Sequence, residues 1–167
     1  MGNKEQPPRR RRPLGVTSKQ QIMVAVLSGA AFSYLLLVIA DIFNQIPPLV
    51  PWSLSLLLVV ISLPTYFYAR RLPTRIENQE LTPEEGVRAM ILGKSMLMTG
   101  CILAGGHLVY VLKWIAYTEI PGPFDRVTHG TVAVMASVVF ALVGSALEKA
   151  CIVDINDEND LSKGAPA

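Results

Sequence analysis

Charge, histidine and cysteine are scarce in this chain of 167 residues. Asp, Glu, Lys and Arg make up 17% of it, against about 25% in an average soluble domain. The two cysteines, Cys101 and Cys151, lie within or at the end of apolar segments, and no Cys/His spacing typical of a metal site is present. These shortages exclude a disulfide-rich secreted domain and a structural zinc site. Together with the high apolar content, they also exclude a disordered chain and an ordinary soluble enzyme.

The sequence patterns of common catalytic sites are also missing. There is no Gly-x-Ser-x-Gly elbow, no phosphate-binding loop and no His-Glu-x-x-His zinc motif. We therefore expect that the chain is not an enzyme. We also expect that it uses no cofactor and no metal.

Apolar residues, by contrast, make up 51% of the chain, and the mean hydropathy is +0.39. They gather in four runs, each close to the ~20 residues that a helix needs to cross a bilayer. The runs cover residues 22–40, 52–69, 90–112 and 127–147. A backbone in lipid must satisfy its own hydrogen bonds, and no run alternates in polarity like a barrel strand. We therefore predict an all-α membrane protein with a bundle of four transmembrane helices.

The segments that flank these runs are polar. A basic stretch precedes the first run, as it does in a secretory signal peptide, but about 19 apolar residues are long for a signal core. No small-x-small cleavage site follows near Asp41, so we interpret the run as a true span. The basic segment 1–21 and the acidic segment 152–167 are expected to be disordered tails.

Lys and Arg are distributed very unequally between the two sides of the membrane. Thirteen of the 15 fall in the two tails and in or beside the loop after the second run, whereas only Lys113 and Arg126 fall in the other loops. The positive-inside rule then places both termini in the cytoplasm. Contact with anionic lipid explains the basic clusters better than nucleic acid, which we do not expect as a partner. The candidate lipid-contacting residues are Arg9, Arg10, Arg11, Arg12, Arg70 and Arg71.

Small residues recur at helical spacing in the last two runs. In lipid, faces of small residues let two helices approach closely. The short loop between these runs makes them antiparallel neighbours, so we predict that their small faces pack together. The residues of this predicted packing face are Gly93, Gly100, Ala104, Ala133, Ala141 and Gly144.

Two ionisable residues lie about one turn inside the predicted membrane boundary, Lys94 on the third helix and Glu148 on the fourth. Such residues are costly in lipid and are candidates for function. Antiparallel helices put both at the same depth, so we predict an ion pair or a pair bridged by water. The pair could simply fix the helix register, or it could relay protons or substrate. Lys94 could also extend alone to the lipid headgroups.

His107 lies on the same face of the third helix as the small residues. It could hydrogen-bond to a backbone carbonyl or to Ser137, or it could act as a switch that titrates near neutral pH. With His129 it makes a poor metal site, because no carboxylate accompanies the two histidines.

The start of the third helix carries a local signal of its own. Thr82 can cap the helix, Pro83 suits its first position and Glu85 completes a capping box. We therefore predict that the helix begins near Pro83, about two turns before it enters lipid.

Several short motifs resemble a known family. They are the basic N-terminus, the Pro-Pro-x-x-Pro-Trp loop at Pro47–Trp52, the Arg88-Ala89 and Lys94-Ser95 pairs, Gly100-x-x-x-Ala104-Gly105, and Glu148-Lys149-x-Cys151. Over about residues 9–157 the chain resembles the actinobacterial membrane family called domain of unknown function 3180. It departs from that family at His107, where an aromatic residue is more usual, and in a longer inner loop. The resemblance implies four spans in a bacterial cytoplasmic membrane and supplies no catalytic residues.

These observations favour an accessory or scaffold component that acts through helix–helix contacts. Its expected partners are membrane lipids and either another membrane protein or a second copy of the chain. The alternative is a small oligomeric transporter or channel subunit, in which Lys94, His107 and Glu148 would line a polar path.

Overall fold

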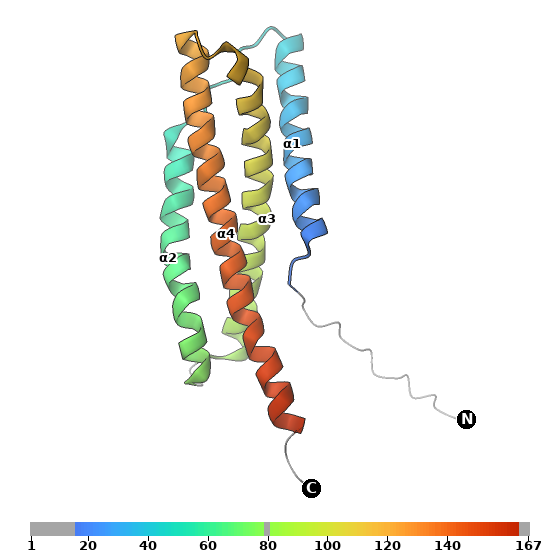
Figure 1. Cartoon of the computed structure of the whole chain (residues 1–167), viewed down its shortest axis with the longest axis vertical. Helices are drawn as coiled ribbons and strands as arrows, with labels where there is room; N and C mark the ends of the chain where they lie inside the picture. Colours follow the sequence, from blue (N-terminus) through green and yellow to red (C-terminus); the bar gives the residue numbers. More distant parts are fainter. Residues whose placement is uncertain (1–15, 79–80, 164–167) are drawn as a thin grey trace, which may run out of the picture.

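The structure is a computed structural model that describes residues 16–78 and 81–163. These residues form four long helices, a short 3-10 turn and no strand (Figure 1). The elements are α1 (Lys19–Ile42), α2 (Trp52–Glu77), α3 (Pro83–Trp114), η1 (Ile115–Tyr117) and α4 (Pro121–Lys163). All four helices are long and apolar enough to cross a membrane. The predicted fold class, an all-α protein with four apolar spans, is confirmed.

Side-chain caps determine where α1 and α3 begin. The hydroxyl of Thr82 accepts a hydrogen bond from the backbone N–H of Glu85, and the Glu85 carboxylate accepts one from the backbone N–H of Thr82. The predicted capping box is therefore confirmed. A second box, formed by Ser18 and Gln21, starts α1 at Lys19, three residues before the apolar run.

The helices extend beyond the apolar runs. A helix can continue past the edge of the lipid hydrocarbon where no residue stops it. α2 continues through Pro64 and Pro73 to Glu77. Residues 152–163, which were expected to be a disordered tail, are the last turns of α4. The sequence offers a reason, since it has neither glycine nor proline between Gly144 and Gly164 to stop the helix. Most of the predicted N-terminal tail, with Arg9–Arg12, and residues 164–167 lie outside the described part.

The four helices lie in a row, in the order α1, α3, α4, α2 (Figure 1). α3 packs against α1 and α4, and α4 packs against α3 and α2. Within the described residues, no Cα atom of α1 lies within 8 Å of one in α2. α1 and α2, the first two helices in the sequence, therefore lie at opposite ends of the row.

Glycines allow the helices to approach closely at both contacts of α3. A Cβ atom placed on Gly29 of α1 would lie 2.0 Å from the carbonyl oxygen of Ile102, and one on Gly105 would lie 2.2 Å from that of Val26. Real side chains do not make such contacts, so only glycine permits the α1–α3 crossing. At the α3–α4 contact, a Cβ on Gly144 would lie 2.5 Å from the backbone nitrogen of Leu97.

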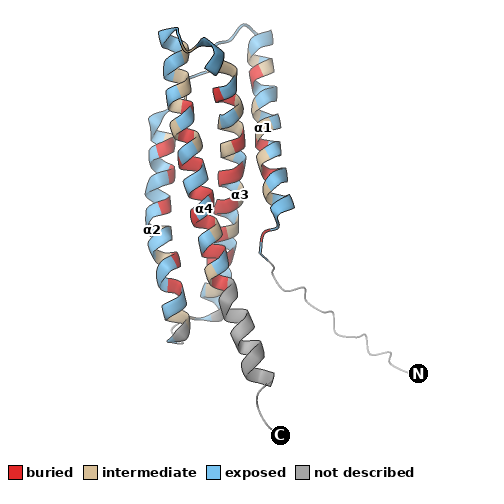
Figure 2. Ribbon diagram, viewed as in Figure 1, coloured by how far each residue is buried: buried red, intermediate tan, exposed pale blue. Residues whose placement is uncertain are grey.

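Buried residues concentrate on the facing sides of α3 and α4 (Figure 2). α2 is attached to α4 through Leu58, Phe140 and Val143 near the middle of the span. Nearer the C-terminal end of α4, Leu72 and Leu147 are fully buried in a second cluster. The inner pair of helices thus forms the core to which α1 and α2 are attached.

Candidate functional site

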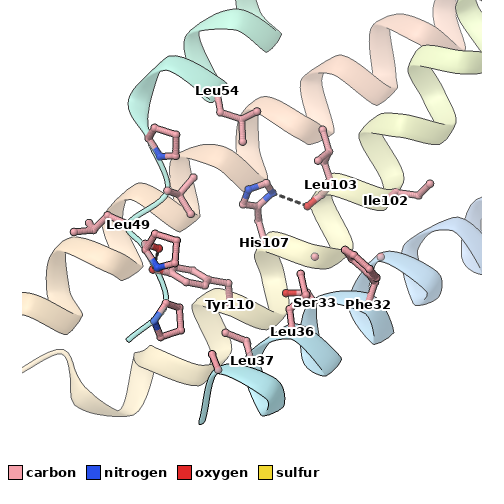
Figure 3. A pocket seen from close by; sticks show the side chains of 17 residues that line it. Phe32, Ser33, Leu36, Leu37, Leu49, Leu54, Ile102, Leu103, His107 and Tyr110 are labelled. Atoms are coloured by element: carbon pink, nitrogen blue, oxygen red, sulfur yellow. Dashed lines mark hydrogen bonds between the residues drawn. The ribbon is translucent and has the colours of Figure 1, made fainter. Parts of the chain in front are cut away.

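A cavity of about 610 Å³ lies between α1, α3, the first turn of α2 and the loop that joins α1 to α2 (Figure 3). This size is typical of a small-molecule site. Gly29 and Gly106 are among its lining residues, and the loop residues from Pro47 to Pro51 form one wall. Its lining is almost wholly apolar. Apart from backbone atoms, the polar groups are the side chains of Ser33, His107 and Tyr110.

His107 keeps one ring nitrogen for its own helix. Its Nδ1 lies 2.7 Å from the carbonyl oxygen of Leu103 (Figure 3). Because a carbonyl oxygen only accepts, Nδ1 carries the proton, and in the neutral ring Nε2 is left as an acceptor. No hydrogen bond to Nε2 is present among the described residues. Figure 3 places the ring between Leu54 of α2 and Ser33 of α1.

The cavity wall formed by the loop is held by side chains of α3 and α4. The Tyr110 hydroxyl donates to the carbonyl of Pro48 at 3.2 Å. The Arg126 guanidinium donates to the carbonyl of Pro47 and, at 3.2 Å, to the Tyr110 hydroxyl. His129 donates from Nδ1 to the carbonyl of Val50 at 2.9 Å. We call these three donors, Tyr110, Arg126 and His129, the loop strap.

Aromatic rings and an ion pair support the loop strap. The Arg126 guanidinium lies 4.9 Å from the centre of the Trp114 ring, and the His129 ring lies 4.5 Å from that of Trp52. Lys113, at the end of α3, pairs with Asp41, at the end of α1, with an Nζ–Oδ1 distance of 2.6 Å. These contacts therefore hold the helices together, from α1 to α4, at the end of the bundle where the loop between α1 and α2 lies.

A buried carboxylate lies at the other end of the helix bundle, along the helix axes from the loop strap. Glu148 is fully buried. Its Oε1 accepts hydrogen bonds from both the backbone N–H and the hydroxyl of Thr17, each at 2.7 Å. Its Oε2 is buried and has no hydrogen-bond partner among the described residues. Thr17 lies just before the first turn of α1, where the positive end of the helix dipole favours a carboxylate.

The family model described as "Protein of unknown function (DUF3180)" matches residues 22–154. The chain belongs to the DUF3180 family. No curated protein and no solved structure shows a match.

In this DUF3180 protein, the three polar residues predicted within the membrane do not come together. Lys94 is half-buried and forms no ion pair with Glu148, so the expected direct pair is wrong. The reason is rotational. The backbone of Glu148 faces Gly93, where an added Cβ would lie 2.8 Å from the Glu148 nitrogen. The next residue along a helix points about 100° away.

The His107–Ser137 contact considered from sequence is also absent, because each side chain bonds to its own helix. Ser137 is fully buried and donates to the carbonyl of Ala133 at 2.7 Å. The predicted packing residues Gly93, Gly100, Ala141 and Gly144 are buried at the α3–α4 contact. Ala133, also on the predicted packing face, is fully buried. Ala104 is half-buried. Arg70 and Arg71 are exposed on α2, and the Arg70 guanidinium lies over the Tyr66 ring.

Sequence reasoning missed the contacts of Thr17, Arg126 and His129. One signal could have pointed to the last two. Three prolines in the loop, Pro47, Pro48 and Pro51, lack an N–H, so the loop has more acceptors than donors. Such carbonyls need donors from elsewhere. Donors near the same membrane surface were the natural candidates.

Replacing Arg126 with alanine is expected to lower the free energy of unfolding by about 1.5–3 kcal/mol, because the lost donor is charged and its acceptor sits in the loop wall. Equilibrium unfolding in mild detergent measures this change. Arg88→Ala is the matched control, since its side chain is 81% exposed and lies 3.9 Å from Glu84. That change should stay within about 0.5 kcal/mol. Equal losses in the two variants would contradict the loop strap.

Proposed function

We propose that this DUF3180 protein is an accessory or scaffold component of a bacterial cytoplasmic membrane, without enzymatic activity of its own. The observation that carries the proposal is the row arrangement. The backbone of α1 lies close only to that of α3, and the backbone of α2 only to that of α4, with Cα atoms within 8 Å. Only 17% and 22% of the residues in the most apolar stretches of α1 and α2 are buried, against 50% in α4. Most of the surface of both helices therefore faces outward and is available for a partner.

Two further features support a role within the membrane. The described connections between the helices are short, so they hold no separate catalytic domain. The close glycine contacts are used inside the chain, by α3 with α1 and with α4. A partner would then bind through the outer faces of α1 or α2.

The orientation belongs to the same proposal. The start of α1 and the end of α4 lie at the same end of the bundle along the helix axes (Figure 1). The described basic residues Arg70, Arg71 and Arg88 belong to the ends of α2 and α3 on that side, whereas Lys113 and Arg126 lie at the other end. We place the first end in the cytoplasm, with Arg70 and Arg71 close to anionic lipid headgroups.

The transporter alternative is not proposed. It required Lys94, His107 and Glu148 to line one polar path. Glu148 is fully buried and accepts a hydrogen bond from Thr17, and His107 lines an apolar cavity. Lys94 is not placed on the lining of that cavity.

Cysteine cross-linking in native membranes tests the proposal. Leu35 of α1 and Leu57 of α2 are each 55% exposed, and Met135 of α4 is 61% exposed. The native cysteines are buried, so single introduced cysteines can be compared. We expect Leu35→Cys or Leu57→Cys to cross-link with a bis-maleimide to one discrete species at more than about tenfold the yield of Met135→Cys.

The mass and composition of the complex, purified in mild detergent, then identify the cross-linked species. A second membrane protein or a second copy of the chain would support the accessory role. A monomer with equal, low cross-linking at all three positions would contradict it.

A further inference from the structure

The cavity beside His107 lies at membrane depth, and hydrocarbon rather than water is its natural content. Empty space deprives the lining atoms of contacts, and apolar cavities of this kind stay dry. The cavity opens sideways, because Phe32 and Leu36 on its lining are 63% and 50% exposed. A chain from the surrounding lipid can therefore enter it without unfolding the row.

Two polar atoms on the wall select among hydrocarbon chains. In the neutral ring of His107, Nε2 is an acceptor, because Nδ1 donates to the Leu103 carbonyl. The Ser33 hydroxyl forms no hydrogen bond with another described residue. Both side chains line the cavity. A hydroxyl group can donate to the first or accept from the second.

The cavity offers nothing to a charged headgroup. No Asp, Glu, Lys or Arg lines it. The cations nearest the loop are already engaged, Arg126 with the Pro47 carbonyl and Lys113 with Asp41. A phosphate in the cavity would lose its water without gaining a counter-charge, which is costly. The loop strap also fixes one wall in advance, which lowers the entropy cost of binding.

We propose that this cavity binds a lipid alcohol, that is, an uncharged hydrocarbon chain that ends in a hydroxyl group. The hydroxyl lies at one of the two polar groups of the wall, His107 or Ser33, and the chain lies along the apolar lining between α1 and α3. This site does not depend on the accessory role, because it uses the inner wall of the row rather than the outer faces of α1 and α2.

Photolabelling of the full-length protein in mild detergent tests the site. The probe is hexadecanol with a diazirine in its chain, and the labelled peptides are identified by mass spectrometry. We expect labelling in α1 and α3 near the cavity. Unlabelled hexadecanol should compete at a concentration about five- to tenfold lower than hexadecane or hexadecyl phosphate, as expected for one or two hydrogen bonds.

Variants separate recognition of the hydroxyl from simple partition into hydrocarbon. His107→Phe and Ser33→Ala keep the wall apolar, and one of the two should remove most of the advantage of the alcohol over the alkane. Ser28→Ala is the control, because this hydroxyl on the same helix bonds to the Ala25 carbonyl and does not line the cavity. Leu54→Trp, which narrows the cavity, should reduce labelling severalfold. The melting temperature of each variant shows that the fold is retained.

Three results would overturn the proposal. The first is labelling spread evenly over lipid-facing residues. The second is equal competition by hexadecanol and hexadecane in the unaltered protein, and the third is preference for hexadecyl phosphate. An alcohol preference that His107→Phe and Ser33→Ala leave unchanged would also place the hydroxyl elsewhere.

Discussion

Replacing Gly29 with alanine is expected to detach α1 from α3 and to lower the free energy of unfolding by about 3 kcal/mol or more. The added Cβ would lie 2.0 Å from the Ile102 carbonyl oxygen and 2.8 Å from its carbonyl carbon. Both atoms belong to the backbone, so no side chain can rotate away and the helices must separate. Overpacking of this kind costs about 1–3 kcal/mol even where side chains can adjust. Equilibrium unfolding in mild detergent measures the loss.

Gly122→Ala is the control for that change. Gly122 lies in the first turn of α4, and a Cβ placed there would have no atom within 4 Å. Alanine also favours the helix, by roughly 0.5–1 kcal/mol over glycine in a helix interior. Gly122→Ala should therefore be neutral or slightly stabilising. If Gly29→Ala is equally stable, the close α1–α3 crossing is incorrect.

Replacing Glu148 with alanine is expected to cost about 3 kcal/mol and to release the start of α1. The change leaves the N–H and the hydroxyl of Thr17 without their shared acceptor, and Thr17 is only 7% exposed. Removing a charged acceptor from buried hydrogen-bond donors lowers the free energy of unfolding by about 1.5–3 kcal/mol. The empty space left by the side chain adds to the loss. Glu148→Gln keeps one acceptor oxygen and should cost less.

A double-mutant cycle identifies the partner in this contact. Thr17→Val removes only the hydroxyl, so Glu148→Ala should cost about 1 kcal/mol less in the Thr17→Val background than in the unaltered chain. Lys94→Ala should show no such coupling with Glu148→Ala. Glu84→Ala is the surface control, since this carboxylate is 85% exposed. Coupling to Lys94 but not to Thr17 would restore the pair that the sequence suggested.

The sequence determines depth along each helix better than rotation about it. Runs of apolar residues predicted the four spans, and the Thr82 capping box predicted the start of α3, because both signals are local. Lys94 and Glu148 were placed at similar depth on adjacent helices. The pairing failed because Gly93, one residue away, is the position that faces Glu148.

Contacts between residues far apart in the sequence could not be predicted from the residues around them. Thr17 and Glu148 are separated by 131 positions, and nothing near either residue indicates the other. The Ser18–Gln21 capping box, in contrast, has the same spacing as the box at Thr82 and could have been recognised. Loop lengths correctly made α3 and α4 neighbours, but they gave no reason to place α1 beside α3 and away from α2.

The order of helices in the row bears on how the protein is made. A ribosome delivers α1 and α2 to the membrane first, yet these two helices do not approach each other in the finished structure. α1 gains its neighbouring helix only when α3 is inserted, and α2 gains its own only when α4 is inserted. Tertiary assembly therefore waits for the second half of synthesis. The contact between Thr17 and Glu148, which joins the start of α1 to α4, can form only when nearly the whole chain is in the bilayer.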